Sequence, residues 1–363
     1  MLVEELRHVW PDAEFFGCAG PRMRREGVEP VIDAESLAVV GLAEVVAHLP
    51  RIYGQYRKLL EAAQHRLPDL AILTDSPDFH LRVARRLKRL GVPILYLVAP
   101  QVWAWRKGRI PVIRHTVDRL LCIFPFEEAF FREHGIPASY IGHPLAGQVR
   151  PTLEKSEFFK KHRLDPSRQL VTVLPGSRKG EAARHLPALL DAVERIYRQQ
   201  VTHFLLPASE TTGAAFFRDR IAGAPIRAIE GETWDAIAHA DLCLAASGTV
   251  TVEAALAGVP MITFYKVTAP SWLAGRLLVR VPFYSMVNLV AGRAVVPELM
   301  QSEMTGERLA AEALHLLGNA GARQRMREDL EEVAGRLSAQ GDAMAKAAVL
   351  VEELMEGHAA HVS

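Results

Sequence analysis

Short apolar runs alternate along the chain with longer segments in which apolar residues recur at helical spacing. The runs that predict strands in the first part of the chain are Ala13 to Cys18, Leu70 to Leu73, Ile94 to Val98, Arg119 to Phe124 and Ser139 to Ile141. A second set comprises Leu170 to Leu174, His203 to Pro207, Ile226 to Ala228, Leu242 to Ala245 and Pro260 to Phe264. Helices are predicted between them, for example over Leu81 to Leu90, Ala183 to Arg198, Thr233 to His239 and Thr251 to Ala257. Strands that alternate with helices indicate α/β domains with parallel sheets.

The two sets of strands predict two doubly wound domains that face a cleft. A chain of 363 residues is too long for one ordinary core. The Gly- and Pro-rich stretch from Gly142 to Pro151 suits a link between domains. We therefore expect one domain over residues 1–150, a second over 151–335, and a C-terminal helical segment over 336–363.

Composition narrows the class of protein only slightly. The chain is 49% hydrophobic and 23% charged, as soluble globular proteins are, and its net charge of +1 does not indicate a nucleic-acid partner. Three cysteines far apart in sequence are expected to be reduced, buried thiols. The sequence contains no H-E-x-x-H, no paired C-x-x-C, no Walker A motif and no G-x-G-x-x-G, so we expect no metal and no cofactor.

In open parallel sheets, ligands bind beyond the carboxyl ends of the strands, so polar residues that follow apolar runs are candidates for a site. The segment TDSPDFH (Thr74 to His80) follows one such run. We assign the role of general base to Asp75, because a carboxylate at a strand end can face the cleft. Ser76 or Asp78 is expected to cap the next helix, and His80 is expected to be structural.

The segment VLPGSRKGEAARH (Val173 to His185) raises the question of a phosphate site. A predicted strand ends in Gly176, Ser177 and Arg178, and a helical pattern follows at once. The N-terminus of a helix offers unpaired N–H groups and the positive end of its dipole to an anion. Taken alone, this motif favours a plain turn. Together with the second strand end described next, it predicts that these three residues hold a phosphate.

A second strand end has a similar composition. Ser247, Gly248 and Thr249 follow the run that ends at Ala245, and Glu253 comes about one helical turn later. Small residues, hydroxyls and N–H groups suit phosphate oxygens, and the Glu253 carboxylate suits the two hydroxyls of a ribose. The alternative is a capping box that involves the same residues. Two anion-friendly helix starts in one domain favour a nucleoside diphosphate.

Two segments combine aromatic and basic residues. Val98 to Arg106 places Trp103 and Trp105 in a loop, which indicates either a binding surface or packing beneath the sheet. Ser271 to Tyr284 is apolar with interleaved arginines. It is predicted to lie on an anionic membrane or to hold an acyl chain, and a core helix with snorkelling arginines is the alternative.

Eight motifs then follow one another in a specific order. They are Ala19-Gly20-Pro21-Arg22-Met23, Asp75-Ser76-Pro77-Asp78-Phe79, Pro100-Gln101-Val102-Trp103-Ala104-Trp105, Pro125-Phe126-Glu127, Ile141-Gly142-His143, Leu174-Pro175-Gly176-Ser177-Arg178, Ser247-Gly248-Thr249 with Glu253, and Asn288-Leu289-Val290-Ala291-Gly292. Together they resemble the lipid-A-disaccharide synthase family over nearly the whole chain.

The resemblance implies an inverting glycosyltransferase with a GT-B fold, made of two Rossmann-like domains. Such an enzyme joins UDP-2,3-diacylglucosamine to 2,3-diacylglucosamine 1-phosphate (lipid X) and forms a β-1,6 disaccharide and UDP. It needs no metal or cofactor and binds no nucleic acid. The resemblance also implies a cytoplasmic enzyme at the inner face of the cytoplasmic membrane, whose C-terminal helices return to the first domain or are exchanged in a homodimer.

The same resemblance implies residue roles. Asp75 would take the proton from the acceptor's 6-hydroxyl. Arg178, with Gly176 and Ser177, would hold the UDP diphosphate. Ser247, Gly248 and Thr249 would complete that cradle, Glu253 would bind the ribose, and Asn288 would contact the donor from a loop. The residues expected to meet membrane or acyl chains are Trp272, Leu273, Arg276, Leu277 and Phe283.

The sequence departs from the family pattern at its start. The family begins with a strand and a Gly-rich loop, whereas residues Leu2 to Trp10 here already have helical spacing. We therefore expect the first domain to lack a strand. The alternatives to the family function are a GT-B enzyme that uses another UDP-sugar and an inactive, N-terminally truncated UDP-binding protein.

Overall fold

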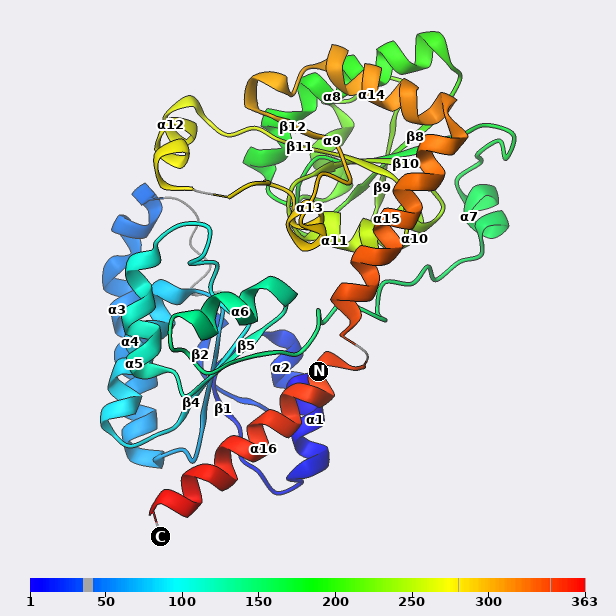
Figure 1. The fold of residues 1–363 in the computed structure, drawn as a ribbon. Coiled ribbons are helices and arrows are strands. Elements are labelled where there is room, and N and C mark those ends of the chain that lie inside the picture. The colour runs from blue at the N-terminus through cyan, green and yellow to red at the C-terminus, as the bar shows by residue number, and fades with distance from the viewer. Residues whose placement is uncertain (35–41, 280, 340, 363) are drawn as a thin grey trace. The chain divides into compact units, whose positions relative to one another are not determined.

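The chain folds into two compact units, each built around parallel strands (Figure 1). Unit 1 comprises Met1–Pro144 and Ala339–Ser363, and unit 2 comprises Leu145–Ser338. The structure is a computed structural model, and it describes residues 1–34, 42–279, 281–339 and 341–362. The chain passes from unit 1 to unit 2 inside the Gly- and Pro-rich stretch 142–151, and it returns to unit 1 before its last helix.

Unit 1 alternates short strands with helices. Its elements are α1 (Leu2–Val9), β1 (Phe16–Ala19), α2 (Pro21–Arg25), β2 (Glu29–Asp33), α3 (Leu42–Arg66), β3 (Ala71–Thr74), α4 (Pro77–Arg89), β4 (Ile94–Leu97), η2 (Lys107–Arg109), α5 (Ile110–Thr116), β5 (Arg119–Cys122), α6 (Pro125–Glu133), β6 (Ala138–Tyr140) and α16 (Ala343–Val362). The predicted strands each overlap an observed one, with bounds shifted by up to three residues. The strand β2 was missed because its sequence EPVID opens with two poor strand formers.

The strands of unit 1 form two parallel sheets, one of β1 and β2 and one in the order β3-β4-β5-β6. A cavity of about 1710 Å³ is lined by residues of both β1 and β3, and also by residues of α1, α3 and α16. The strand that the sequence analysis expects the first domain to lack would belong to this unit.

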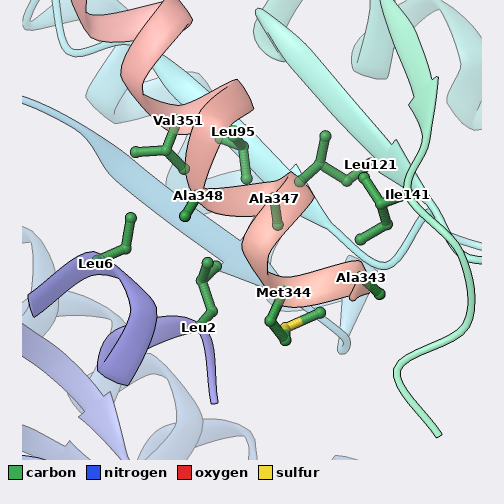
Figure 2. Packing of buried hydrophobic residues seen from close by; sticks show 10 residues of the cluster. All are labelled: Leu2, Leu6, Leu95, Leu121, Ile141, Ala343, Met344, Ala347, Ala348 and Val351. Atoms are coloured by element: carbon green, nitrogen blue, oxygen red, sulfur yellow. The ribbon is translucent and has the colours of Figure 1, made fainter. Parts of the chain in front are cut away.

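The first and last helices of the chain share one core (Figure 2). Leu2 and Leu6 of α1 lie against Val351 and other small apolar residues of α16. Leu95 of β4 and Leu121 of β5 complete the cluster from the sheet. Burial of these side chains fixes α16 against unit 1 of its own chain, because each buried apolar side chain contributes about 1.5–3 kcal/mol.

Unit 2 has a six-stranded parallel sheet with helices on both sides (Figure 1). Its elements are α7 (Lys155–Lys161), β7 (Leu170–Leu174), α8 (Lys179–Gln199), β8 (His203–Ala208), α9 (Ala214–Arg218), β9 (Arg227–Glu230), α10 (Thr233–Ala238), β10 (Leu242–Ala246), α11 (Thr249–Leu256), β11 (Met261–Tyr265), α12 (Ala269–Leu278), α13 (Met286–Ala291), β12 (Glu298–Met300), η3 (Gln301–Glu303), α14 (Gly306–Gly318) and α15 (Ala320–Ser338). The five predicted strands are confirmed, and the three-residue β12 was too short to be predicted.

The strand order of this sheet, β12-β11-β10-β7-β8-β9, is that of a doubly wound fold. The chain runs outward from β7 to β9, returns to the other side of β7, and runs outward again from β10 to β12. The order therefore reverses between β7 and β10, which are direct neighbours. In such sheets the crevice for a ligand lies beyond the carboxyl ends of the two strands at this point.

Candidate functional site

Asp75 lies at the carboxyl end of β3, where the backbone turns sharply into α4. Asp75 and Ser76 both have left-handed φ angles, 55° and 35°. Two side chains stabilise the turn through the backbone oxygen of Asp75. The Tyr96 hydroxyl donates to this oxygen at 2.6 Å, and His80 Nδ1 donates to it at 3.0 Å. The Asp75 carboxylate is exposed and accepts the N–H of Ser76 at 2.9 Å. Strain held by neighbouring bonds is typical of functional turns.

The predicted cap at the start of α4 is wrong. Ser76 is the N-cap residue but its side chain makes no capping bond, and Asp78 lies inside the first turn. Asp78 instead accepts hydrogen bonds from Arg106 and Arg109, which are 28 and 31 residues away. A local cap preference was overridden by two cations that local sequence does not reveal. The structural role predicted for His80 agrees with its contact to the turn.

The two tryptophans of the loop after β4 lie in different surroundings. Trp103 anchors the loop to Glu127, and Trp105 lies at the surface. Trp103 is buried and donates its indole N–H to Glu127 Oε1 at 3.0 Å, whereas Trp105 is 39% exposed. Glu127 Oε2 accepts the backbone N–H groups of Phe124 at 3.1 Å and Ile123 at 3.3 Å. The packing alternative therefore holds for Trp103, and the surface alternative holds for Trp105.

Glu127 is a buried carboxyl group that sequence analysis did not assign. Its side chain is 1% exposed. Burial raises its pKa from 4.5 to about 7, and the N–H donors of Trp103, Phe124 and Ile123 oppose that shift. The motif Pro125-Phe126-Glu127 was the only sequence signal, because the indole partner lies 24 residues earlier.

The PGSR turn joins β7 to α8 in unit 2. Gly176 has a φ of +113°, and a Cβ there would lie 2.6 Å from Cδ of Glu181, so only glycine fits without displacing that side chain. Arg178 is the N-cap residue of α8, and its side chain makes no capping bond. Ser177 and Arg178 are both exposed. The turn therefore presents a hydroxyl, a guanidinium and the N-terminus of a 21-residue helix.

His185 fixes this turn from below. Its ring is buried, and Nδ1 donates to the backbone oxygen of Pro175 at 2.8 Å. Nε2 must then accept, and it accepts the backbone N–H of Lys266 at 3.0 Å. Burial lowers the pKa of His185, which favours this neutral tautomer. Sequence analysis reached His185 as the end of the motif but gave it no role, because Lys266 lies 81 residues later.

The SGT turn joins β10 to α11, and its capping-box alternative is wrong. The N-cap residue is Gly248, which has no side chain to cap the helix. The Ser247 hydroxyl donates to the backbone oxygen of Tyr284 at 2.9 Å, so it does not accept a helix N–H there. Gly248 and Thr249 are exposed. The first N–H groups of α11 are thus not used by a capping side chain.

The two turns begin side by side. Leu174, the last residue of β7, pairs with Ala245 near the end of β10. Both turns therefore lie at the point where the strand order reverses, and both lead into helix N-termini without a side-chain cap. Each dipole contributes about 0.3–1 kcal/mol to binding an exposed anion. This arrangement suits two linked phosphates.

Glu253 lies on α11 beyond the SGT turn, and Trp234 of α10 contacts it. The indole N–H of Trp234 donates to Glu253 Oε2 at 3.2 Å. Burial raises the pKa of Glu253, and the indole bond opposes the shift. The contact orients one carboxylate oxygen. Sequence analysis missed Trp234, which stands at the start of a predicted helix with no local sign of its partner.

Asn288 lies in helix α13 and not in the expected loop. It is fully buried, and its Oδ1 accepts the backbone N–H groups of Val295 and Val296 at 2.8 and 3.0 Å. Its Nδ2 donates to the Val296 oxygen at 3.0 Å and to Glu298 Oε1 at 2.8 Å. Four protein contacts therefore use the hydrogen-bonding capacity of this amide.

Helix α12 stands apart from the sheet of unit 2 (Figure 1). Leu273 is 66% exposed and Arg276 is exposed, whereas Trp272 is half-buried and lies 5.9 Å from the ring of Tyr284. Phe283, beyond the helix, is also half-buried. The Leu277 side chain lies outside the described part of the structure. The core-helix alternative does not fit the exposed Leu273.

Thiols, possible metal ligands and membrane spans can also be described from the structure. The three thiols are free; the expected burial is confirmed for Cys122 and Cys243 and is wrong for Cys18, which is half-buried. Within residues 1–34, 42–279, 281–339 and 341–362, three His, Cys, Asp or Glu side chains do not gather anywhere as a possible metal site. Over the same residues, every helix is too short or too polar to cross a membrane.

Comparison with known proteins gives the family. The model of the lipid-A-disaccharide synthetase family matches residues 1–351. A lipid-A-disaccharide synthase of Solibacter usitatus is 65% identical over 363 residues, which cover 100% of this chain and 95% of that protein.

Solved structures show the same fold at low sequence identity. The UDP-GlcNAc 2-epimerase from Neisseria meningitidis bound to UDP-GlcNAc has a TM-score of 0.62 at 11% identity, with 98% of this chain and 95% of that chain covered. WaaG, a glycosyltransferase involved in lipopolysaccharide biosynthesis, has a TM-score of 0.56 at 13% identity, with 96% and 93% covered. The fold is therefore of the GT-B type. The chain belongs to the lipid-A-disaccharide synthase family and has that family's glycosyltransferase activity in lipid A biosynthesis.

Proposed function

We propose that unit 2 binds the UDP donor through the two adjacent turns at the reversal of strand order. Gly176, Ser177 and Arg178 hold one end of the diphosphate, and Ser247, Gly248 and Thr249 hold the other. The single observation that carries this proposal is the pairing of Leu174 with Ala245, which sets both helix N-termini next to each other. The helix dipoles and the Arg178 guanidinium neutralise the charge of the leaving UDP without a metal.

Glu253 accepts the ribose hydroxyls in this proposal. Its carboxylate keeps one oxygen toward the Trp234 indole and offers the other to the sugar. Asn288 does not contact the donor directly in this proposal, because protein groups already use the hydrogen bonds of its amide. It holds the Glu298 carboxylate, which accepts the backbone N–H of Tyr284. The backbone oxygen of Tyr284 in turn accepts the Ser247 hydroxyl of the SGT turn. We therefore replace direct donor contact by Asn288 with a positioning role.

Asp75 of unit 1 acts as the base on the acceptor. The acceptor is 2,3-diacylglucosamine 1-phosphate, and the donor is UDP-2,3-diacylglucosamine. The acceptor's O6 attacks C1 of the donor sugar, the bond between C1 and the UDP oxygen breaks, and the hydroxyl proton passes to the Asp75 carboxylate. Its exposure and the rigid turn beneath it support this role.

The exposed residues of α12 meet the lipid phase in this proposal. Leu273 and Arg276 combine an apolar side chain with a cation, as helices at an anionic membrane surface do. The enzyme then acts as a peripheral protein of the membrane that carries both lipid substrates.

The test is a transfer assay with both substrates in detergent micelles. The wild-type protein is expected to form the disaccharide and UDP in equal amounts. Asp75→Asn is expected to lower kcat by about 10²- to 10⁴-fold, as loss of a general base does, and to leave UDP binding unchanged. Arg178→Gln is expected to weaken UDP binding about tenfold or more.

Three results would contradict the proposal. Full activity of Asp75→Asn would remove Asp75 from the base role. UDP binding by the wild type without turnover would favour an inactive UDP-binding protein. Turnover of another UDP-sugar in place of the diacylated donor would favour a different GT-B enzyme.

A further inference from the structure

Two guanidinium groups converge beside the Asp75 turn. Arg106 Nη1 donates to both carboxylate oxygens of Asp78, at 2.9 and 3.2 Å, and Arg109 Nη2 donates to one of them. Asp78 lies three residues after Asp75, in the first turn of α4. Tyr96 holds the same turn, because its hydroxyl donates to the Asp75 backbone oxygen at 2.6 Å.

Both arginines keep N–H groups that Asp78 does not use. Arg106 uses Nη1 and Arg109 uses Nη2 toward Asp78, and in the described residues no hydrogen bond occupies their remaining N–H groups. The side chains of Asp78 and Arg106 are 74% and 43% exposed, whereas the side chain of Arg109 is 17% exposed, so Arg106 offers the more open guanidinium. The two guanidiniums exceed the single Asp78 carboxylate by one positive charge, and the Asp75 carboxylate lies three residues away. A guanidinium carries five N–H donors in a fork that matches phosphate oxygens.

The surrounding chain adds further positive charge. Residues 75 to 116 include nine Lys or Arg residues and two acidic ones, Asp75 and Asp78. Partial burial acts to raise the pKa of Asp78, but hydrogen bonds and charges from Arg109 and Arg106 outweigh it and lower the pKa. Asp78 is therefore ionised at neutral pH, and it holds the two guanidiniums in one orientation.

The loop that carries Arg106 is fixed before any ligand binds. Trp103 anchors it through the indole bond to Glu127, and the Arg106 guanidinium lies 4.2 Å from the centre of the Trp105 ring. Arg106 itself has a left-handed φ of 58°, a strained conformation that its neighbours must hold. Preorganised donors lose less conformational entropy on binding.

The chemistry of the acceptor requires an anion site next to the base. In the glucosamine ring, C1 and C5 flank the ring oxygen, and C5 carries the C6 that bears the reactive hydroxyl. The phosphate on C1 and the hydroxyl on C6 therefore lie on the same edge of the ring. A base for O6 and a site for the phosphate must be neighbours on the protein.

We propose that Arg106 and Arg109, oriented by Asp78, bind the phosphate group of the acceptor sugar and so place its 6-hydroxyl at Asp75. This proposal rests on the proposed function of Asp75 as the base of unit 1. It makes the phosphate a requirement for productive binding, and it assigns acceptor selectivity to unit 1.

The experiment compares two acceptors, 2,3-diacylglucosamine 1-phosphate and its dephosphorylated form, in micelles of a neutral detergent. Arg106→Gln and Arg109→Gln are each expected to raise KM for the phosphorylated acceptor about 10- to 100-fold, as loss of a charged hydrogen bond does. KM for the dephosphorylated acceptor and KM for the UDP donor should stay within about twofold of wild type. Arg106→Lys keeps the charge but not the fork and should fall in between.

Arg86→Gln is the matched control, because Arg86 is an exposed arginine farther along α4. It should leave both acceptor KM values unchanged. Sedimentation with anionic phospholipid vesicles provides a second arm. If the arginines bind lipid headgroups instead, Arg106→Gln will weaken sedimentation and leave the acceptor KM in neutral micelles unchanged, which overturns the proposal.

Equal losses on both acceptors would also overturn the proposal, because they indicate a general structural effect. Failure of the underlying function is distinguishable, since it would remove turnover of every acceptor in the wild type as well. Circular dichroism of each variant separates misfolding from lost recognition, and a misfolded Arg109→Gln leaves Arg106→Gln and Arg106→Lys to decide.

Discussion

Replacing Glu127 with glutamine is expected to remove a pH-dependent loss of stability from unit 1. Burial raises the pKa of this carboxyl from 4.5 to about 7. Between these two pH values the unfolded chain releases its proton while the folded chain keeps it, so the free energy of unfolding falls as pH rises. The shift of about 2.5 pKa units corresponds to about 3 kcal/mol, lost by about pH 8 and fully retained only below about pH 4.5.

The assay is urea unfolding of the wild type and Glu127→Gln, followed by tryptophan fluorescence at about pH 4.5 and about pH 8. Glutamine cannot ionise, and its poorer fit to the three N–H donors costs the same at both pH values. The stability of the variant relative to wild type should therefore improve by about 3 kcal/mol from the lower pH to the higher. Glu133→Gln, on the exposed side of the same helix, is the control.

A change of less than about 1 kcal/mol in that relative stability would refute the reasoning, since one pKa unit corresponds to about 1.4 kcal/mol. It would mean that the three N–H donors outweigh burial and keep Glu127 ionised in the folded protein. A change of the opposite sign would mean that the folded-state pKa lies below 4.5.

Three further predictions concern unit 2. Gly176→Ala should destabilise the protein by about 1–3 kcal/mol in thermal unfolding and weaken UDP binding in calorimetry. The reason is that Gly176 has a φ of +113° and a Cβ there would lie 2.6 Å from Cδ of Glu181. Unchanged UDP affinity would contradict the place of Gly176 in the phosphate site. His185→Phe removes the partner of the buried Pro175 oxygen and of the half-buried Lys266 N–H and should cost about 2–5 kcal/mol in urea unfolding, whereas a cost below about 1 kcal/mol would argue against this bridge. Trp234→Phe removes the indole bond to Glu253 and should weaken UDP binding a fewfold with little effect on stability. Uridine monophosphate and free diphosphate serve as comparison ligands. An unchanged affinity for UDP would remove Trp234 from the ribose site.

The strands and the two helix starts of unit 2 were predictable because their signals are local. Leu170 to Leu174 and Leu242 to Ala246 are buried at every position and apolar at all but Thr172, as strands covered on both faces are. Small residues directly after each run then mark the turns.

What could not be predicted depends on contacts between distant residues. Asp78 has the composition of a cap, yet two arginines about 30 residues later decide its role. Asn288 looks like a polar loop residue, yet its amide is enclosed by backbone groups of a segment that only the fold brings near. Periodicity in the sequence cannot reveal such long-range pairs.

The shared core of α1 and α16 has a consequence for how the protein is made. These helices pack on each other although about 340 residues separate them in the chain. At about 5–20 residues per second, a ribosome needs roughly 20–70 s to travel between them. During that time the apolar face of α1 lacks α16, on which it packs in the folded protein. Unit 2 is then synthesised before the last helix of unit 1 exists. Chaperones that recognise nascent chains therefore have a long window in which to act on this protein.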